Sequence, residues 1–98
     1  MITAIAIQTV IEGMEDQLMR LMSDLTHQVT VNEPGCIQFM YVKSTDRKLT
    51  YVVVEQYKDS AAFEFHKHTA YLASFIPQMM KYLTHAPEVI TCTDVLPS

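Results

Sequence analysis

The chain has 98 residues, of which 49% are hydrophobic and 18% are charged, and its formal net charge at pH 7 is −4. This composition excludes a disordered chain, and the length predicts a single globular domain over residues 1–98. Because no basic cluster is present, we expect neither a nucleic acid nor an anionic membrane as a partner. No apolar run reaches the roughly 18 residues of a membrane span, and no signal peptide begins the chain, so a cytoplasmic location is expected. The two cysteines show no metal-ligand spacing, and we expect no bound metal.

The first half of the chain predicts two strands on either side of a helix. Residues 2–10 are largely apolar on both alternating faces, as in a strand that is covered on two sides. Apolar residues recur at helical spacing over residues 14–31, and the Asn-Glu-Pro-Gly turn that follows ends this helix. Residues 36–44 form the second predicted strand, and simple alternation places Cys36 on the face opposite Phe39.

The second half predicts a strand, a helical region and a last strand. Residues 49–57 are rich in β-branched and aromatic residues, which favour strands. Either Asp59 or Ser60 is suited to cap the helix that follows. We expect this helical region to break or kink before Pro77, because proline removes a backbone donor and clashes with the preceding turn. Residues 88–96 form the last predicted strand.

The order of these elements predicts an α+β fold, a ferredoxin-like βαββαβ sandwich with helices on one face of a four-stranded antiparallel sheet. The second and fourth strands then form opposite edges, which places Cys36 and Cys92 too far apart for an intrachain disulfide. The other face of the sheet is apolar, and a second copy would cover it in a chain this small. We therefore expect a homodimer in which two sheets pack face to face.

A carboxylate and an imidazole lie close together in sequence on two mostly apolar elements. Glu55 shares one strand face with Tyr51, Val53 and Tyr57. His66 shares a helix face with the small and aromatic side chains three and four positions before it, Ala62 and Phe63. This pair is the candidate site for chemistry.

Two segments, NEPGC at 32–36 and VVVEQYKDSAAFEFHKH at 52–68, carry a family resemblance. The chain resembles the antibiotic biosynthesis monooxygenase family, whose members form small dimeric α+β barrels. The positions that match the family pattern are Glu33, Pro34, Gly35, Glu55, Tyr57, Ala62 and His66. Family members include cofactor-free quinol-type monooxygenases, haem-degrading monooxygenases, an isomerase of phosphorylated autoinducer-2 and proteins with no assigned activity.

Two departures narrow what the resemblance implies. Many relatives carry a second histidine five residues after the first, where this chain has Tyr71. The haem-degrading members carry a strand asparagine, a helix tryptophan and a later histidine, and the corresponding positions here hold Ala6, His66 and Ile76. Haem degradation is therefore disfavoured, and we expect no cofactor.

Cofactor-free oxygenation requires a phenol or quinol as its anion, because the electron-rich ring itself passes an electron to dioxygen. His66 is the candidate base, since an imidazole titrates near neutral pH, and Glu55 is the candidate group that orients it or stabilises its protonated form. The candidate substrate-binding residues, as pocket walls or as donors to a substrate oxygen, are Phe39, Tyr51, Tyr57, Phe63 and Tyr71. The expected partner is thus a small hydrophobic or aromatic substrate.

Other interpretations of these residues remain open. The same base suits keto–enol isomerisation, and the stretch YKDSAAFEFHKHT is similar to the autoinducer-2 isomerase. A non-catalytic dimer that binds a small hydrophobic metabolite is a further alternative, since the fold does not define the function. His66 then serves only as a hydrogen-bonded core residue, and Glu55 only satisfies buried donors.

Overall fold

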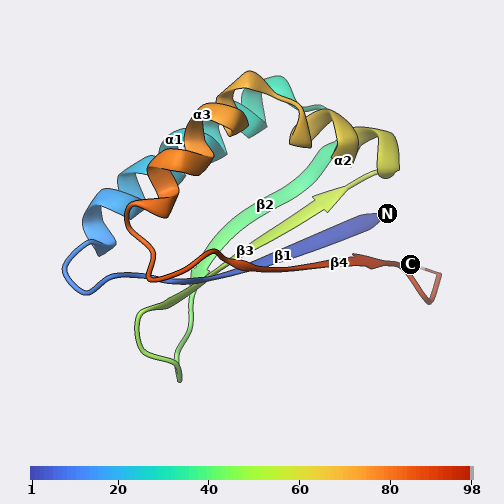
Figure 1. Cartoon of the computed structure of the whole chain (residues 1–98). Coiled ribbons are helices and arrows are strands. Elements are labelled where there is room, and N and C mark those ends of the chain that lie inside the picture. The colour runs from blue at the N-terminus through green and yellow to red at the C-terminus, as the bar shows by residue number, and fades with distance from the viewer. Residues whose placement is uncertain (98) are drawn as a thin grey trace.

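The structure of the protein is a computed structural model, which describes residues 1–97. Its elements, in chain order, are β1 (Ile2–Thr9), α1 (Glu15–Asn32), β2 (Cys36–Lys43), β3 (Thr50–Tyr57), α2 (Ser60–Lys67), α3 (Ala70–Met80) and β4 (Glu88–Thr93). The strands form one antiparallel sheet in the order β2-β3-β1-β4, and the helices cover one of its faces (Figure 1). The predicted ferredoxin-like α+β fold is confirmed, with β2 and β4 at opposite edges.

The core forms where the apolar stripe of α1 meets the sheet. Side chains three or four positions apart on α1 are buried, as helical spacing requires, and these are Leu18, Met22, Leu25 and Val29. They pack with Tyr51 and Val53 of β3 and with Phe75 and Met79 of α3. The alternation of β3 therefore directs Tyr51, Val53, Glu55 and Tyr57 toward the helices, as the sequence predicts.

Strand β2 departs from simple alternation at its start. Cys36 pairs with Tyr57, whereas Gln38 pairs with Gln56, so Ile37 is an extra residue between these two pairs. This bulge brings Cys36 to the helix-covered side, where it packs against the core together with Phe39. The prediction that Cys36 and Phe39 lie on opposite faces is therefore wrong. Both cysteines are free thiols.

The second helical region breaks earlier than the sequence predicts. Asp59 caps α2, because its carboxylate accepts a hydrogen bond of 2.8 Å from the backbone N–H of Ala62. The helix ends after Lys67, and the Thr69 side chain caps α3 by accepting from the N–H of Leu72. Helix α3 then continues through Pro77, so the break predicted before this proline lies instead at the Thr69 cap.

The face of the sheet that is turned away from the helices is apolar. Its central pairs, Ile5 with Val54 and Ile7 with Val52, join β1 and β3. Toward the edges, Met40, Val42 and Ile90 expose 39%, 43% and 45% of their surface. A face of this kind is a candidate surface for association. Of the helices in residues 1–97, none combines the length and apolar character that crossing a bilayer requires.

Candidate functional site

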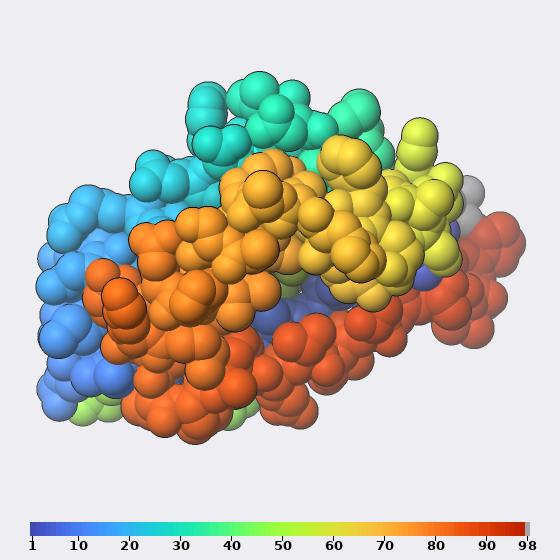
Figure 2. Space-filling model, turned by 45° about the horizontal axis from the view of Figure 1, so that its top comes forward, coloured from blue at the N-terminus to red at the C-terminus, as the bar shows by residue number. Residues whose placement is uncertain are grey.

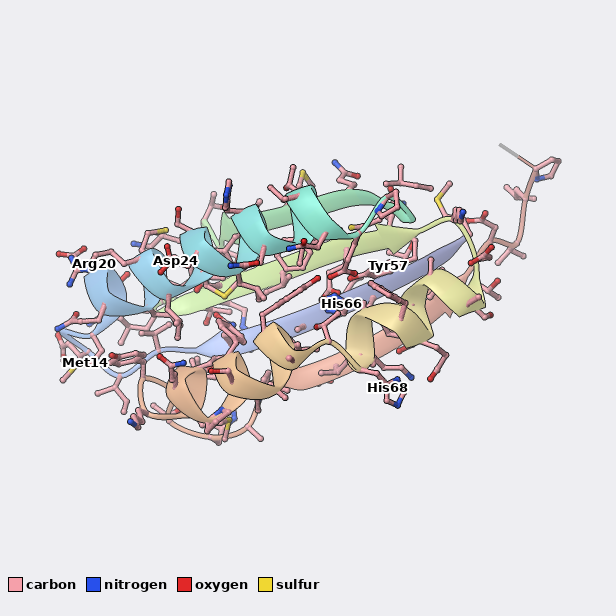
Figure 3. All side chains as sticks on the ribbon, turned by 90° about the horizontal axis from the view of Figure 1, so that it is seen from above. Met14, Arg20, Asp24, Tyr57, His66 and His68 are labelled. Atoms are coloured by element: carbon pink, nitrogen blue, oxygen red, sulfur yellow. The ribbon has the colours of Figure 1, made fainter. Side chains whose placement is uncertain are left out.

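His66 lies on the inner side of α2 and is only 4% exposed. Its ring faces the sheet beside Tyr57, with ring centroids 5.2 Å apart, while Phe39 lies 6.2 Å away. His68, two residues further on, lies on the opposite side of α2 from His66, and 77% of its side chain is exposed (Figure 3). The helical repeat thus separates the two histidines, and only His66 is directed inward.

A second carboxylate, Glu33, holds one nitrogen of the His66 ring. The Nδ1 atom lies 3.0 and 2.9 Å from the two oxygens of Glu33, which is itself only 3% exposed. The hydroxyl of Tyr71 donates a further hydrogen bond to the same carboxylate. Because an ionised carboxylate only accepts hydrogen bonds, Nδ1 carries the proton and Nε2 is the nitrogen left for chemistry.

The Glu33–His66 contact depends on a close approach of α2 to the turn after α1. A Cβ atom added at Gly35 would lie 2.6 Å from the Cβ of Ala62, a distance that real Cβ atoms do not tolerate. Only glycine at 35 and a small residue at 62 allow this packing. The Gly35–Ala62 contact therefore explains why these residues accompany Glu33 and His66 in the sequence pattern.

Glu55 lies on the other side of the His66 ring. Its Oε1 atom is 3.3 Å from Nε2 of His66 and also accepts a 2.6 Å hydrogen bond from the hydroxyl of Tyr57. Burial raises the pKa of Glu55, although the Tyr57 hydrogen bond and the charge of His66 oppose this effect. Burial also raises the pKa of Tyr57, so its hydroxyl stays protonated and donates. Glu55 therefore lies within ion-pair distance of Nε2 and can stabilise the ring electrostatically when it is protonated.

Glu33, His66 and Glu55 together form the His66 array. Next to this array is a mostly apolar cavity of about 380 Å³. It extends between the sheet, α2, α3 and the segment that leads into β4, and its polar lining residues are Gln8, Glu55, His66 and Lys67. The space-filling view shows a hollow between the helices and the last strand, with β1 visible at its floor (Figure 2). The volume lies within the range of small-molecule sites, about 300–1,000 Å³. His66 is among the residues that line this cavity.

The structure brings most of the predicted site residues to this region. Phe39 and Phe63 line the cavity. Tyr57 and Tyr71 do not line it, but their hydroxyls donate to Glu55 and Glu33 respectively. Tyr51 lies elsewhere on the sheet, where its hydroxyl donates to Glu15, and Lys43 pairs with the same carboxylate.

Two residues of the site, Glu33 and Gln8, are not among the candidates that the sequence predicts. Glu33 matches the family pattern, and the structure shows that it holds the imidazole of His66. Gln8 is a buried polar residue of β1, only 1% exposed, and it lines the cavity. A glutamine that follows six mostly apolar residues in a strand was the available signal for Gln8. Within residues 1–97, no cluster of three or more His, Cys, Asp or Glu side chains has an arrangement suited to a metal ion.

The fold and the site define a class, namely small ferredoxin-like α+β proteins with a buried histidine between two carboxylates beside an apolar cavity. The family model for antibiotic biosynthesis monooxygenase matches residues 1–78, and the chain belongs to this family. Its resemblance to that family is thereby confirmed.

Solved structures of similar proteins share the fold. A candidate antibiotic biosynthesis monooxygenase from Caulobacter crescentus CB15 is 25% identical with a TM-score of 0.92, over 97% of this chain and 90% of that chain. A conserved protein from Methanosarcina mazei Go1 is 20% identical with a TM-score of 0.87, over 93% of this chain and 89% of that chain. An antibiotic biosynthesis monooxygenase is 22% identical with a TM-score of 0.85, over 99% of this chain and 100% of that chain. The latter two likenesses concern the fold alone. No curated protein matches the chain.

Proposed function

We propose that the protein is a cofactor-independent monooxygenase that acts on a quinol-like or polyketide-like aromatic. One observation carries the proposal: Nδ1 of His66 is held by Glu33, while the ring borders a mostly apolar cavity of about 380 Å³. Membership of the antibiotic biosynthesis monooxygenase family supports a reaction of this class. A hydrogen-bonded core histidine requires no such cavity beside its ring.

His66 is the proposed proton acceptor. With Nδ1–H bound to Glu33, the Nε2 lone pair takes the proton of a phenol or of an activated ring carbon. The resulting imidazolium forms an ion pair with Glu55, whose Oε1 is 3.3 Å from Nε2. Glu33 thus orients the base and Glu55 stabilises its charged form, as an acid–histidine pair requires.

The apolar cavity serves the oxygen step. The substrate anion passes one electron to dioxygen, and the two radicals combine into a carbon–oxygen bond of a peroxide anion. This anion recovers the proton from His66, and the hydroperoxide then loses water, so that a CH₂ group and O₂ become a C=O group and H₂O. Exclusion of bulk water protects the peroxide and strengthens the electrostatic interactions of the array.

The two alternative functions, an isomerase and a non-catalytic binding protein, make different demands on the residues that line the cavity. An isomerase of a phosphorylated sugar needs several cations to hold the phosphate. Among the described lining residues Lys67 is the one cation, and it already pairs with Glu64 at 2.7 Å. This observation favours the oxygenase over the isomerase. A non-catalytic dimer that binds a small hydrophobic metabolite fits the cavity equally well, but it does not require the two carboxylates that flank His66.

We also propose that two copies associate through the open sheet face. The side chains on this face are apolar at its centre and partly exposed at its edges, as at Met40, Val42 and Ile90. Burial of such a surface against its own copy gives a symmetric dimer and shields the underside of the sheet. The proposed assembly is thus a dimer with two independent cavities on its outer sides.

Oxygen uptake by the purified protein tests the proposed reaction. The substrates are a panel of hydroquinones and anthrone-like phenols, and the variants are His66→Ala and Glu33→Gln. We expect uptake above the spontaneous rate, reduced about 10²–10⁴-fold in both variants. His68→Ala is the matched control, since this exposed histidine lies two residues from His66 at the end of α2 but outside the cavity.

The outcomes separate the candidate functions. Wild-type uptake that persists in His66→Ala would exclude His66 as the base. Binding of the phenols without any uptake would support the non-catalytic binding protein instead.

A further inference from the structure

Gln8 is the one polar side chain of the cavity that the proposed reaction does not use, apart from the ion-paired Lys67 among the described lining residues. It lies on β1, directed toward the helices, and is 1% exposed. A buried carboxamide normally satisfies its two N–H donors with oxygen acceptors. The partners of Gln8 are therefore informative.

The orientation of the Gln8 carboxamide is set by its neighbours. Its Oε1 accepts a 2.7 Å hydrogen bond from the hydroxyl of Tyr41. Its Nε2 faces two sulfur atoms, 3.8 Å away in Met22 and 3.4 Å away in Met79. A thioether accepts hydrogen bonds only weakly, and it does not donate, so both contacts require nitrogen at this position. The two N–H groups are thus held at the cavity with only weak acceptors.

Gln8 and the His66 array lie at different places along the cavity. In the sheet register Gln8 pairs with Tyr51, whereas Ala4 pairs with Glu55, so Gln8 lies four residues along β1 from the Glu55 position. Four residues of a strand correspond to about 13 Å. Between them the floor of the cavity is formed by Ala6 and Val53, which offer no hydrogen bond from their side chains.

We propose that Gln8 is a specificity-determining residue that donates a hydrogen bond to a carbonyl oxygen at the end of the substrate remote from His66. The proposal rests on the proposed function, because the other end of the substrate is taken to be the phenol that meets His66. A single ring is too short to meet both groups, whereas two or three fused rings are long enough. The substrate class is therefore a fused-ring phenol that carries a ketone or quinone carbonyl at its far end.

The weak sulfur acceptors of the Gln8 N–H groups also explain how the protein would select a substrate with a carbonyl at its far end. A substrate with the carbonyl replaces a weak acceptor by a strong one, and a net hydrogen bond of this kind is worth about 1 kcal/mol, or about fivefold in affinity. A ring system without the carbonyl leaves the carboxamide against the thioethers. The preference is thus for the oxygenated far end rather than for aromatic surface in general.

The test compares two ligands that differ at the far end and keep the same unconjugated phenol. One is 6-hydroxy-2-tetralone, whose ketone is insulated from the aromatic ring by a CH₂ group, and its partner is 5,6,7,8-tetrahydro-2-naphthol, which lacks the ketone. Dissociation constants are measured by calorimetry without oxygen for the wild type, Gln8→Leu and Gln8→Met. Both variants remove the N–H donors, and Gln8→Met keeps the approximate volume.

We expect the wild type to prefer the ketone about fivefold over its partner, and we expect this ratio to fall to about one in both variants. Unfolding midpoints show whether each variant is folded. A wild-type ratio of one, or a ratio that survives in both folded variants, would overturn the role of Gln8. A Gln8-dependent preference without any oxygen uptake would keep this inference and refute the proposed oxygenase.

Discussion

The contact between Gly35 and Ala62 offers the sharpest test of how the fold builds the site. In Gly35→Ala the added methyl carbon would lie 2.6 Å from the Cβ of Ala62. Carbon atoms in contact prefer about 3.5–4.0 Å, so α2 must move away by about 1 Å. The same movement stretches the Glu33–His66 hydrogen bonds from 2.9 and 3.0 Å to nearly 4 Å, beyond hydrogen-bond range.

The size of the effect follows from this geometry. Overpacking of this kind costs about 1–3 kcal/mol of unfolding free energy. Ala62→Gly alone costs about 1 kcal/mol, because glycine disfavours a helix. In the double variant the methyl group added at 35 meets the Cα of residue 62 at 3.6 Å, an ordinary contact. We therefore expect the double variant to be more stable than the sum of the single effects by about 1–2 kcal/mol.

Urea unfolding of the wild type, the two single variants and the double variant measures this coupling. Oxygen uptake provides a second readout, since a 1 Å misplacement of a catalytic group can cost about 100-fold in rate. We expect Gly35→Ala to lose activity and the double variant to recover most of it. Strictly additive unfolding free energies, or full activity in folded Gly35→Ala, would refute the argument that this contact positions His66.

Three further predictions concern the carboxylates and the open sheet face. Because burial raises the pKa of Glu55, its contribution to stability is present below the pKa of unfolded glutamate and is lost as pH rises through the folded value. In urea unfolding, Glu55→Gln should therefore gain stability relative to the wild type as pH rises above the pKa of unfolded glutamate, and a constant difference would contradict the sign. Tyr71→Phe removes the donor to buried Glu33 and should cost about 1–3 kcal/mol in the same assay, whereas an unchanged midpoint would show that the bond contributes nothing. Val54→Lys, at the centre of the open face, should give a monomer in light scattering, while Asp24→Lys on the exposed side of α1 should leave the dimer intact, and a dimeric Val54→Lys would exclude this interface.

Much of the fold was predictable because it depends on local patterns. Strand alternation in β3 identified the face that carries Glu55, and helical spacing identified the buried stripe of α1. Asp59 was recognisable as a cap because a short acidic side chain before a helix satisfies a free backbone N–H. The order of elements left few topologies, and the ferredoxin-like arrangement was among them.

Local sequence patterns gave the wrong prediction at two places, the start of β2 and the break in the second helical region. The bulge at Ile37 adds one residue to β2, and a shift of one residue reverses the face of Cys36. The helix break lies at Thr69 because its hydroxyl caps a new helix, whereas Pro77 was the more obvious breaker in the sequence. Hydrophobic periodicity does not distinguish these possibilities.

The sequence by itself determined that Glu55 and His66 lie near each other, because a strand and the next helix are joined by a short turn. Only the tertiary structure decided that Glu33, 33 residues before His66, holds the imidazole. Likewise, only the packing of α1 and α3 on the sheet brings Met22 and Met79 to Gln8 and leaves a cavity between Gln8 and His66. The physical reason is that such contacts depend on how closely elements approach, and that distance is set by side-chain volume at positions such as Gly35 and Ala62.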